Sequence, residues 1–110
     1  MRYLVHAAEG PGFASPEEAV QVLEKTVLPS FDALIKLEKE KKILGGGLPI
    51  GDRAFVFIVE ASSNEELDRM LREIPMWGAL KWHVTALQTF EGRAAQERQV
   101  VTQLKKAARR

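Results

Sequence analysis

The sequence predicts a single α+β domain in which a four-stranded antiparallel sheet carries two helices on one face. Up to Phe90, strand-like and helix-like segments follow one another in the order strand, helix, strand, strand, helix, strand. One strand, residues 53–60, is apolar on both of its faces and belongs inside a sheet. A short helix ends at Pro75 and turns through residues 76–78 directly into the last strand, which ties a helix layer to the sheet.

Composition is consistent with one globular domain and excludes several classes of protein. The 110 residues are 45% hydrophobic and 28% charged, enough for a buried core. The 16 basic and 15 acidic residues leave a net charge of +1, so we expect no nucleic-acid and no membrane partner. The absence of cysteine excludes disulfides and thiolate ligands. No apolar run reaches the roughly 20 residues of a membrane span, and the polar N-terminus predicts a strand, so we expect a cytoplasmic protein.

The first part of the chain predicts a strand and a long helix. Residues 3–8 alternate between two faces, as a strand does. Ser15 is a good N-cap and Pro16 suits the first helical position. Apolar residues then recur every three or four positions, which is typical of a helix packed on a core. Pro29 lies inside this stripe and predicts a kink or a split near residues 25–28.

The middle of the chain predicts two strands. Residues 43–50 contain Gly45–Gly47 and a proline, which suits an irregular edge strand. The three glycines lack the helix start and the Lys-Ser/Thr that would make a phosphate loop. Gly51-Asp52 then predicts a hairpin turn into the strand Arg53–Glu60. Because two helices cover only one face of so small a sheet, we expect a second copy of the chain to cover the other.

The second half predicts a helix, a strand and a helical extension. Ser62 or Ser63 caps the helix that leads to Pro75. Residues 80–90 form the last core strand, and residues 94–108 are a plausible further helix. The apolar side of that last helix is thin, so we expect it to dock on a partner or to fray.

The order βαββαβ with both helices on one face is the ferredoxin-like arrangement. Two such sheets packed face to face form a dimeric α+β barrel. We therefore predict a ferredoxin-like barrel domain over residues 1–92 and a C-terminal helical extension over residues 93–110.

Four segments also carry a family resemblance: the strand end Val59-Glu60, the helix Glu65–Leu71, the corner Ile74–Trp77 and the strand Leu80–Val84. With these segments the chain resembles the muconolactone isomerase family of dimeric α+β-barrel proteins. The resemblance implies a homodimer or a ring of dimers, with a small-molecule pocket between sheet and helices. It also implies a proton shift in an unsaturated lactone of aromatic catabolism, without a cofactor. Family isomerases carry an acid partway along the first helix, and the matching position here is Ser30.

Histidines are the first candidates for such chemistry. A proton shift needs a base beside an activated carbon acid. His6 and His83 are the side chains that titrate near neutrality without help. In this topology the first and last strands are adjacent and antiparallel, so the two imidazoles can approach each other. We take His6 as the candidate base, and the alternative for both is a hydrogen-bonded histidine at a strand end or a dimer seam. Two histidines without a placed carboxylate form an incomplete ligand set, so we expect no metal.

Four further residues are candidates for substrate binding. Arg53 could clamp a carboxylate with two hydrogen bonds, and its alternative is a salt bridge to Asp52 or to a neighbouring helix. Trp77 could form an aromatic wall of the pocket, and its alternative is packing in the core or at an interface. His83 could form a polar wall of the pocket. Ser30 could line the pocket or lie on the helix surface.

These observations leave three hypotheses about function. The first is a cofactor-free isomerase acting on a small unsaturated, carboxylated lactone, with His6 as base and Arg53 as anion clamp. The second is a non-catalytic barrel protein that binds a small aromatic molecule or serves in assembly. The third is a barrel relative that degrades haem or oxidises quinones.

Overall fold

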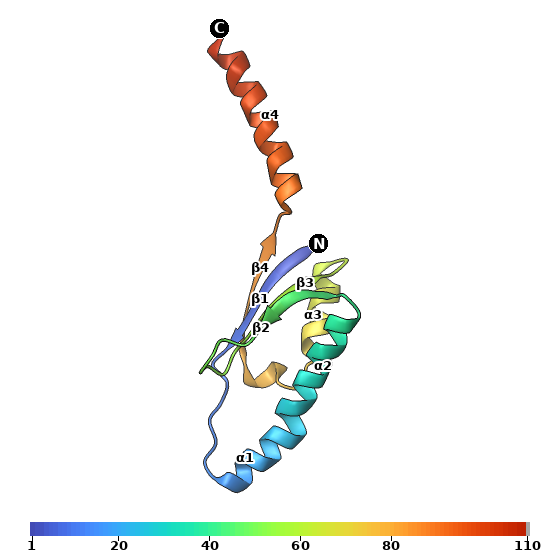
Figure 1. Ribbon diagram of the computed structural model, residues 1–110, viewed down its shortest axis with the longest axis vertical. Helices are drawn as coiled ribbons and strands as arrows, with labels where there is room; N and C mark the ends of the chain where they lie inside the picture. The colour runs from blue at the N-terminus through green and yellow to red at the C-terminus, as the bar shows by residue number, and fades with distance from the viewer. Residues whose placement is uncertain (110) are drawn as a thin grey trace.

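The fold is described for residues 1–109 by a computed structural model (Figure 1). The elements in chain order are β1 (Arg2–Ala8), α1 (Pro16–Val22), the π-helical turn η1 (Leu23–Val27), α2 (Leu28–Lys39), β2 (Ile43–Gly47), β3 (Phe55–Glu60), α3 (Asn64–Arg72), the 3-10 turn η2 (Trp77–Ala79), β4 (Lys81–Leu87) and α4 (Phe90–Ala108). The molecule measures 74 × 26 × 22 Å because α4 projects from one end (Figure 1). None of the helices described is both long enough and apolar enough to cross a membrane.

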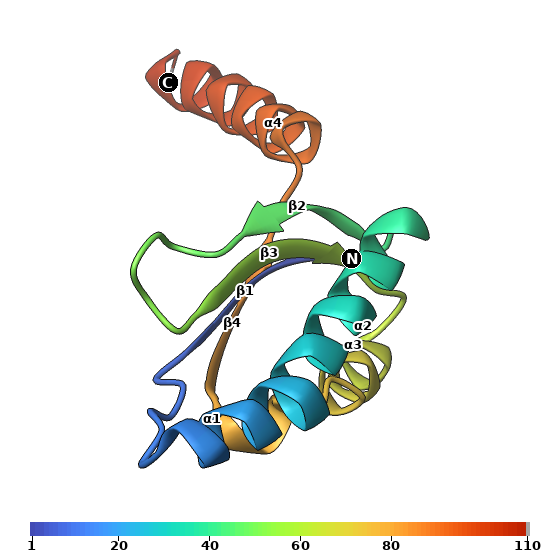
Figure 2. The ribbon, with the colours of Figure 1, turned by 60° about the horizontal axis from the view of Figure 1, so that its bottom comes forward.

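The sheet confirms the predicted ferredoxin-like architecture. Its strand order is β2-β3-β1-β4, and each neighbouring pair is antiparallel. Figure 2 shows α1, α2 and α3 together on one side of this sheet. Strand β3 lies inside the sheet, as its two apolar faces predict. The dimeric barrel, which needs a second chain, stays a prediction.

Side chains alternate between a buried and an uncovered face of the sheet. Tyr3, Val5 and Ala7 of β1 face the helices and are buried. The alternate residues of β1 and β3 point to the opposite side, which no helix of the described chain covers. We call this uncovered side the open face; it includes Leu4, His6, Val56, Ile58 and His83.

The long helical segment begins where its sequence predicts and departs from α-helical geometry just before its proline. The hydroxyl of Ser15 accepts a hydrogen bond from the backbone N–H of Glu18 at 3.1 Å, so the N-cap is confirmed. Pro29 donates no backbone hydrogen bond, and the π-helical turn η1 lies immediately before α2. The proline thus locally widens the helix without breaking it.

Strand β2 is held close to β3 by a glycine. Gly46 has φ of +146°, and a Cβ at this position would lie 2.3 Å from the carbonyl oxygen of Val56. A register shift between Ile43 and Gly45 marks the irregularity that the glycines and the edge position predict. Strand β2 nevertheless ends at Gly47, so residues 48–49 leave the strand and a turn begins at Ile50.

The corner after α3 brings the helix layer back to the sheet. The backbone N–H of Trp77 donates to the carbonyl of Ile74 at 2.8 Å, and the indole of Trp82 donates to the carbonyl of Trp77 at 2.8 Å. The guanidinium of Arg72 lies 4.4 Å from the centre of the Trp77 ring. Both tryptophans therefore hold the corner, consistent with the packing alternative.

Further element boundaries differ from the predicted ones. Strand β3 begins at Phe55, two residues later than expected, because the turn extends through Arg53. Strand β4 ends at Leu87, and α4 begins at Phe90 instead of Ala94. The helix starts early because the hydroxyl of Thr89 accepts a hydrogen bond from the N–H of Gly92 at 3.0 Å.

Candidate functional site

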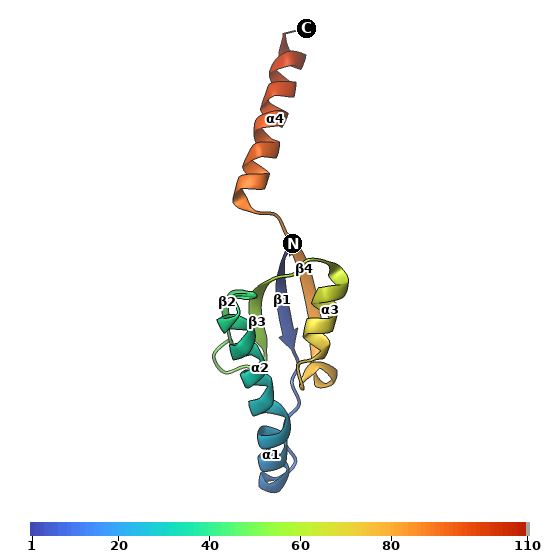
Figure 3. The ribbon, with the colours of Figure 1, turned by 90° about the vertical axis from the view of Figure 1, so that its right-hand side faces the viewer.

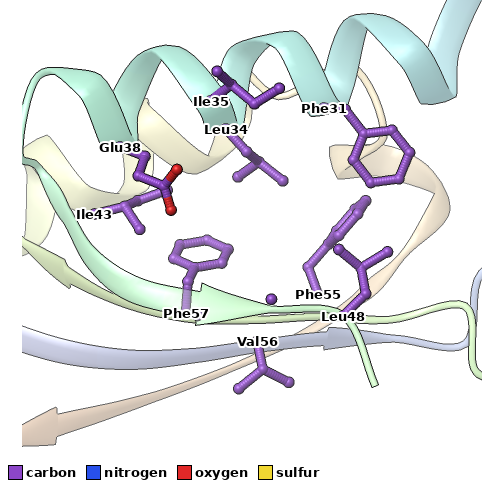
Figure 4. Close-up of a pocket in the computed structure, with 11 residues that line it drawn as sticks. Phe31, Leu34, Ile35, Glu38, Ile43, Leu48, Phe55, Val56 and Phe57 are labelled. Atoms are coloured by element: carbon purple, nitrogen blue, oxygen red, sulfur yellow. The ribbon is translucent and has the colours of Figure 1, made fainter. Parts of the chain in front are cut away.

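The candidate site is an apolar cleft between the helix layer and the end of the sheet where β3 begins. Two adjoining hollows of about 140 and 220 Å³ form it. They share three wall residues, Phe31, Leu48 and Phe55, so they are parts of one groove. Figure 4 shows the smaller hollow, with Phe31, Leu34 and Glu38 of α2 facing Phe55 and Phe57 of β3. We refer to the two hollows together as the cleft.

Local sequence explains why the cleft stays open. Gly46 and Gly47 line the smaller hollow and have no side chains that could fill it. Phe31 and Phe55 meet edge to face, with ring centres 5.7 Å apart and an interplanar angle of 86°. The two rings thus give the cleft a firm aromatic wall between its two hollows.

Polar groups lie at both ends of this apolar cleft. Glu38 lines the smaller hollow, and Asp52 and Arg53 line the larger one. All three residues are exposed. The remaining walls are mostly aliphatic or aromatic, including Val22, Leu23, Val27, Met76 and Leu80 in the larger hollow. The cleft therefore suits a ligand with an apolar body and a charged or polar end.

Arg53 carries the most informative charge at the cleft. Its backbone N–H donates to the carboxylate of Asp52 at 2.8 Å. Its guanidinium lies beside Gly12, where a Cβ would sit 3.6 Å from Nη1. No carboxylate among residues 1–109 forms an ion pair with this guanidinium. The predicted alternative, a salt bridge to Asp52 or to a neighbouring helix, therefore does not form among the described residues, and the guanidinium is available to an anion.

The two histidines meet as the topology predicts, but away from the cleft. His6 and His83 are directly opposite each other on β1 and β4, with ring centres 6.4 Å apart. Both side chains are exposed on the open face. Because successive side chains of a strand point to opposite faces, the sheet separates this pair from the cleft. Neither histidine lines the cleft.

Ser30 and Trp77 have structural contacts instead of a place in the cleft wall. Ser30 is fully buried between α2 and the corner after α3, where its hydroxyl is hydrogen-bonded to the backbone on both sides. Trp77 packs partly against the core and stacks under Arg72. Neither residue lines the two hollows. Of the five residues that we expect to act in catalysis or substrate binding, only Arg53 reaches the cleft.

Several cleft residues were not predicted from the sequence. Phe31 belongs to the apolar stripe of a helix and Phe55 to the buried face of a strand, so the sequence predicts that both are core residues. Leu48 and Glu38 gave no local signal, because a loop leucine and a glutamate near a helix end are common surface residues. From the sequence, Asp52 is a turn residue and a possible salt-bridge partner of Arg53, with no role in catalysis. In the described part of the chain, no three histidine, aspartate or glutamate side chains are placed to share a metal ion.

Comparison with known proteins supports the fold. No protein-family model matches the sequence, and no curated protein matches it. Among solved structures, muconolactone isomerase aligns with a TM-score of 0.66 and 19% identity over 81% of this chain and 90% of the isomerase. The 5-chloro-2-hydroxyhydroquinone dehydrochlorinase of Burkholderia phenoliruptrix, solved with 2,5-dihydroxybenzoquinone, aligns with a TM-score of 0.62 and 20% identity over 84% and 98% of the two chains. The resemblance predicted from the sequence is therefore confirmed at the level of the fold.

Proposed function

We propose that the chain is a cofactor-free isomerase that binds a small, unsaturated, carboxylated ring in the cleft and moves a proton within it. The observation that supports this proposal most directly concerns Arg53, which lines an apolar cleft and whose guanidinium has no ion-pair partner among the described residues. A buried or half-buried carboxylate of the ligand would form charge-assisted hydrogen bonds with it. The two solved relatives, named for a lactone and a hydroquinone, act on small oxygenated rings.

The size and walls of the cleft favour a single-ring ligand. The larger hollow, about 220 Å³, is smaller than the roughly 300–1,000 Å³ of sites that hold drug-sized molecules. Phe31 and Phe55 offer flat apolar surfaces on which an unsaturated ring can lie. With its carboxylate on Arg53, the ring would therefore extend along the aromatic wall toward Leu48.

Asp52 is our proposed proton carrier, in place of His6. A proton shift needs one group that removes a proton from carbon and returns it to another carbon of the conjugated system. Asp52 lines the same hollow as Arg53, whereas His6 lies across the sheet. The positive charge of Arg53 would also stabilise the enolate oxygen that develops when the proton leaves. In this proposal Asp52 acts as the base and Arg53 as the cation that stabilises the enolate.

Binding is tested by calorimetric titration of the full chain with muconolactone. We expect Arg53→Gln to weaken binding by about tenfold or more, because hydrogen bonds to charged groups contribute about 1.5–3 kcal/mol. Arg69→Gln is the matched control, because Arg69 is exposed on α3 and does not line the cleft. Equal affinity in both variants, or no binding by the parent chain, contradicts the proposed site.

Catalysis is tested by NMR in deuterated buffer, which reports deuterium entering the ring carbons of muconolactone and its product. Asp52→Asn keeps an oxygen that can accept the hydrogen bond from the N–H of Arg53, but it cannot take up a proton. We expect this change to slow exchange by about a hundredfold or more while binding persists. His6→Gln should leave the rate unchanged. Loss of exchange in His6→Gln alone would instead place the base on the open face.

A non-catalytic binding protein is the second candidate. It is favoured by the exposure of Asp52 and by the small number of polar groups at the cleft. This reading predicts that a ring ligand binds in an Arg53-dependent way and that no deuterium enters it. The two experiments together therefore separate an isomerase from a binding protein.

Self-association is also part of the proposal. The open face presents Leu4, Val56 and Ile58 without a covering layer. We propose that a second copy covers it and so forms a homodimer, as the sequence predicts. Burial of apolar surface would drive this association.

A further inference from the structure

Helix α4 is the largest feature that the proposed function leaves unexplained. It runs for 19 residues, or about 28 Å at the usual rise, and points away from the domain (Figures 1 and 3). None of its residues is buried, and it does not pack on the sheet or on the other helices described. Its apolar residues Phe90, Val101 and Leu104 are spaced so that they share one side of the helix. We call α4 the arm and this side its stripe.

The direction of the arm is set by hydrogen bonds at its base. The hydroxyl of Thr89 caps the helix through the N–H of Gly92. The amide of Gln88 donates to the side-chain oxygen of Gln96 at 2.6 Å and accepts from the guanidinium of Arg93 at 3.3 Å. These bonds link the first turns of the arm to the segment that leaves β4. Within the described chain, no other element covers the stripe.

Charge indicates which surface of that molecule fits. Residues 90–110 contain six basic and two acidic residues, so two arms placed side by side would repel each other. Residues 9–24 contain four acidic residues and no basic one. Among residues 1–109, no ion pair involves Glu17 or Glu24. The segment thus carries acidic charge only, and this charge complements the basic arm.

The same segment also exposes apolar side chains. Val20 is 54% exposed and Leu23 is 40% exposed, and Glu17 and Glu24 stand three and four residues from Val20, near one side of the helix. On the arm, Arg98 and Lys105 flank the stripe at Val101 and Leu104 in the same manner. The exposed apolar residues of residues 17–24 are therefore flanked by acids, and those of the arm are flanked by bases. Such pairing buries both stripes and pairs their charges.

We propose that the arm of one copy docks on α1 and η1 of a second copy, with its stripe against Val20 and Leu23 and its basic flank toward Glu17 and Glu24. Figure 1 shows that α1 and the arm lie at opposite ends of the molecule. Two molecules related by a two-fold axis and lying antiparallel would each place an arm beside the other's α1. The exchange is then reciprocal and closes as a symmetric pair.

The contact is located by NMR with a spin label on the arm. The chain has no cysteine, so Gln103→Cys introduces a single attachment point on the side of the helix away from the stripe. This labelled chain is mixed with isotope-labelled chain that carries no spin label. We expect the backbone amide signals of Val20, Leu23 and Glu24 to lose intensity, and the loss to shrink as salt is raised. Unchanged signals in this segment, or losses confined to the open face or to another arm, overturn the proposal.

Two substitutions on the spin-labelled chain test the stripe itself. Leu104→Asp should abolish the signal loss, because it places a charge in the apolar contact. Gln99→Asp is the matched control: it adds the same charge on the opposite side of the arm and should leave the loss in place. Circular dichroism checks that both variants keep the helix. Equal effects of the two substitutions would contradict docking through the stripe. An arm that instead binds vesicles of anionic lipid, with no signal loss on α1, would show that the stripe serves a membrane.

Discussion

The hydroxyl of Ser30 joins α2 to the corner after α3 by accepting a hydrogen bond from the backbone N–H of Met76 at 3.0 Å. The same hydroxyl donates to the carbonyl of Thr26, one turn earlier, at 2.7 Å. Ser30 is fully buried, and Met76 lines the cleft. One small polar group therefore satisfies a buried backbone donor and positions a wall of the cleft. It occupies the position at which the resemblance implies an acid.

Ser30→Ala should lower the free energy of unfolding by about 1–3 kcal/mol, because it leaves the buried N–H of Met76 without a partner. Urea unfolding monitored by circular dichroism measures the change. Thr102→Ala is the control, because the hydroxyl of Thr102 makes a similar bond to the carbonyl of Arg98 but is exposed. It should cost less than about 0.5 kcal/mol. Equal losses in the two variants would show that the bond to Met76 is not the reason for the effect.

Gly46→Ala should destabilise the fold by about 1–3 kcal/mol or more, through a strained backbone and a clash with the carbonyl of Val56. Gly45→Ala is a close control, since a Cβ there meets no atom within 4 Å and φ is not positive. Thermal unfolding of both variants measures the difference. A Gly46→Ala chain as stable as Gly45→Ala would mean that β2 moves away from β3 without cost. That result would also predict an altered smaller hollow, because Gly46 lines it.

Glu60 should contribute to the acid sensitivity of the fold. A hydrogen bond from the guanidinium of Arg2 at 2.8 Å holds the pKa of Glu60 below its ordinary value, and the charges of Arg2 and the N-terminus add to this shift. Because the pKa of Glu60 is lower in the folded state than in the unfolded state, its ionised form stabilises the fold at pH values above the unfolded-state pKa. This stabilisation disappears as the pH falls through the lowered pKa.

The test compares melting temperatures of the parent chain and Glu60→Gln between about pH 6 and about pH 3. We expect the variant to be less stable at the upper end and its deficit to shrink toward the lower end, where Glu60 of the parent becomes protonated. Glu73→Gln, at an exposed position, should show no such convergence. A Glu60→Gln deficit that stays constant with pH would rule out the ionised pair as its cause.

Ile58→Lys should separate the proposed homodimer into monomers. Ile58 lies on the open face, where a lysine would have to be buried against a second copy. Sedimentation velocity at micromolar concentration measures the mass. Ile50→Lys makes the same chemical change at a fully exposed turn residue and should leave the mass unchanged. A parent chain that already sediments as a monomer would contradict the homodimer.

Most of the fold could be predicted because its signals are local or periodic. Ser15 caps a helix through its own neighbours, Pro29 perturbs the helix that contains it, and the two apolar faces of Phe55–Glu60 place that strand inside a sheet. The strand order also predicted that His6 and His83 would be adjacent. The boundaries near Thr89 were missed, because a cap hydrogen bond competes with continuation of the strand and the sequence alone does not decide between them.

The sequence by itself determined the order of the elements, the caps of the first two helical segments, the interior strand and the likeness to a barrel family. Only the tertiary structure decided which side chains share a space. It directed Ser30 into a backbone clamp, placed His6 across the sheet from the cleft, and brought Phe31 and Phe55 together around an opening beside Arg53. The physical reason is that caps and periodicity depend on residues a few positions apart. A cleft depends on which residues from distant segments fail to fill the space between a helix and a sheet.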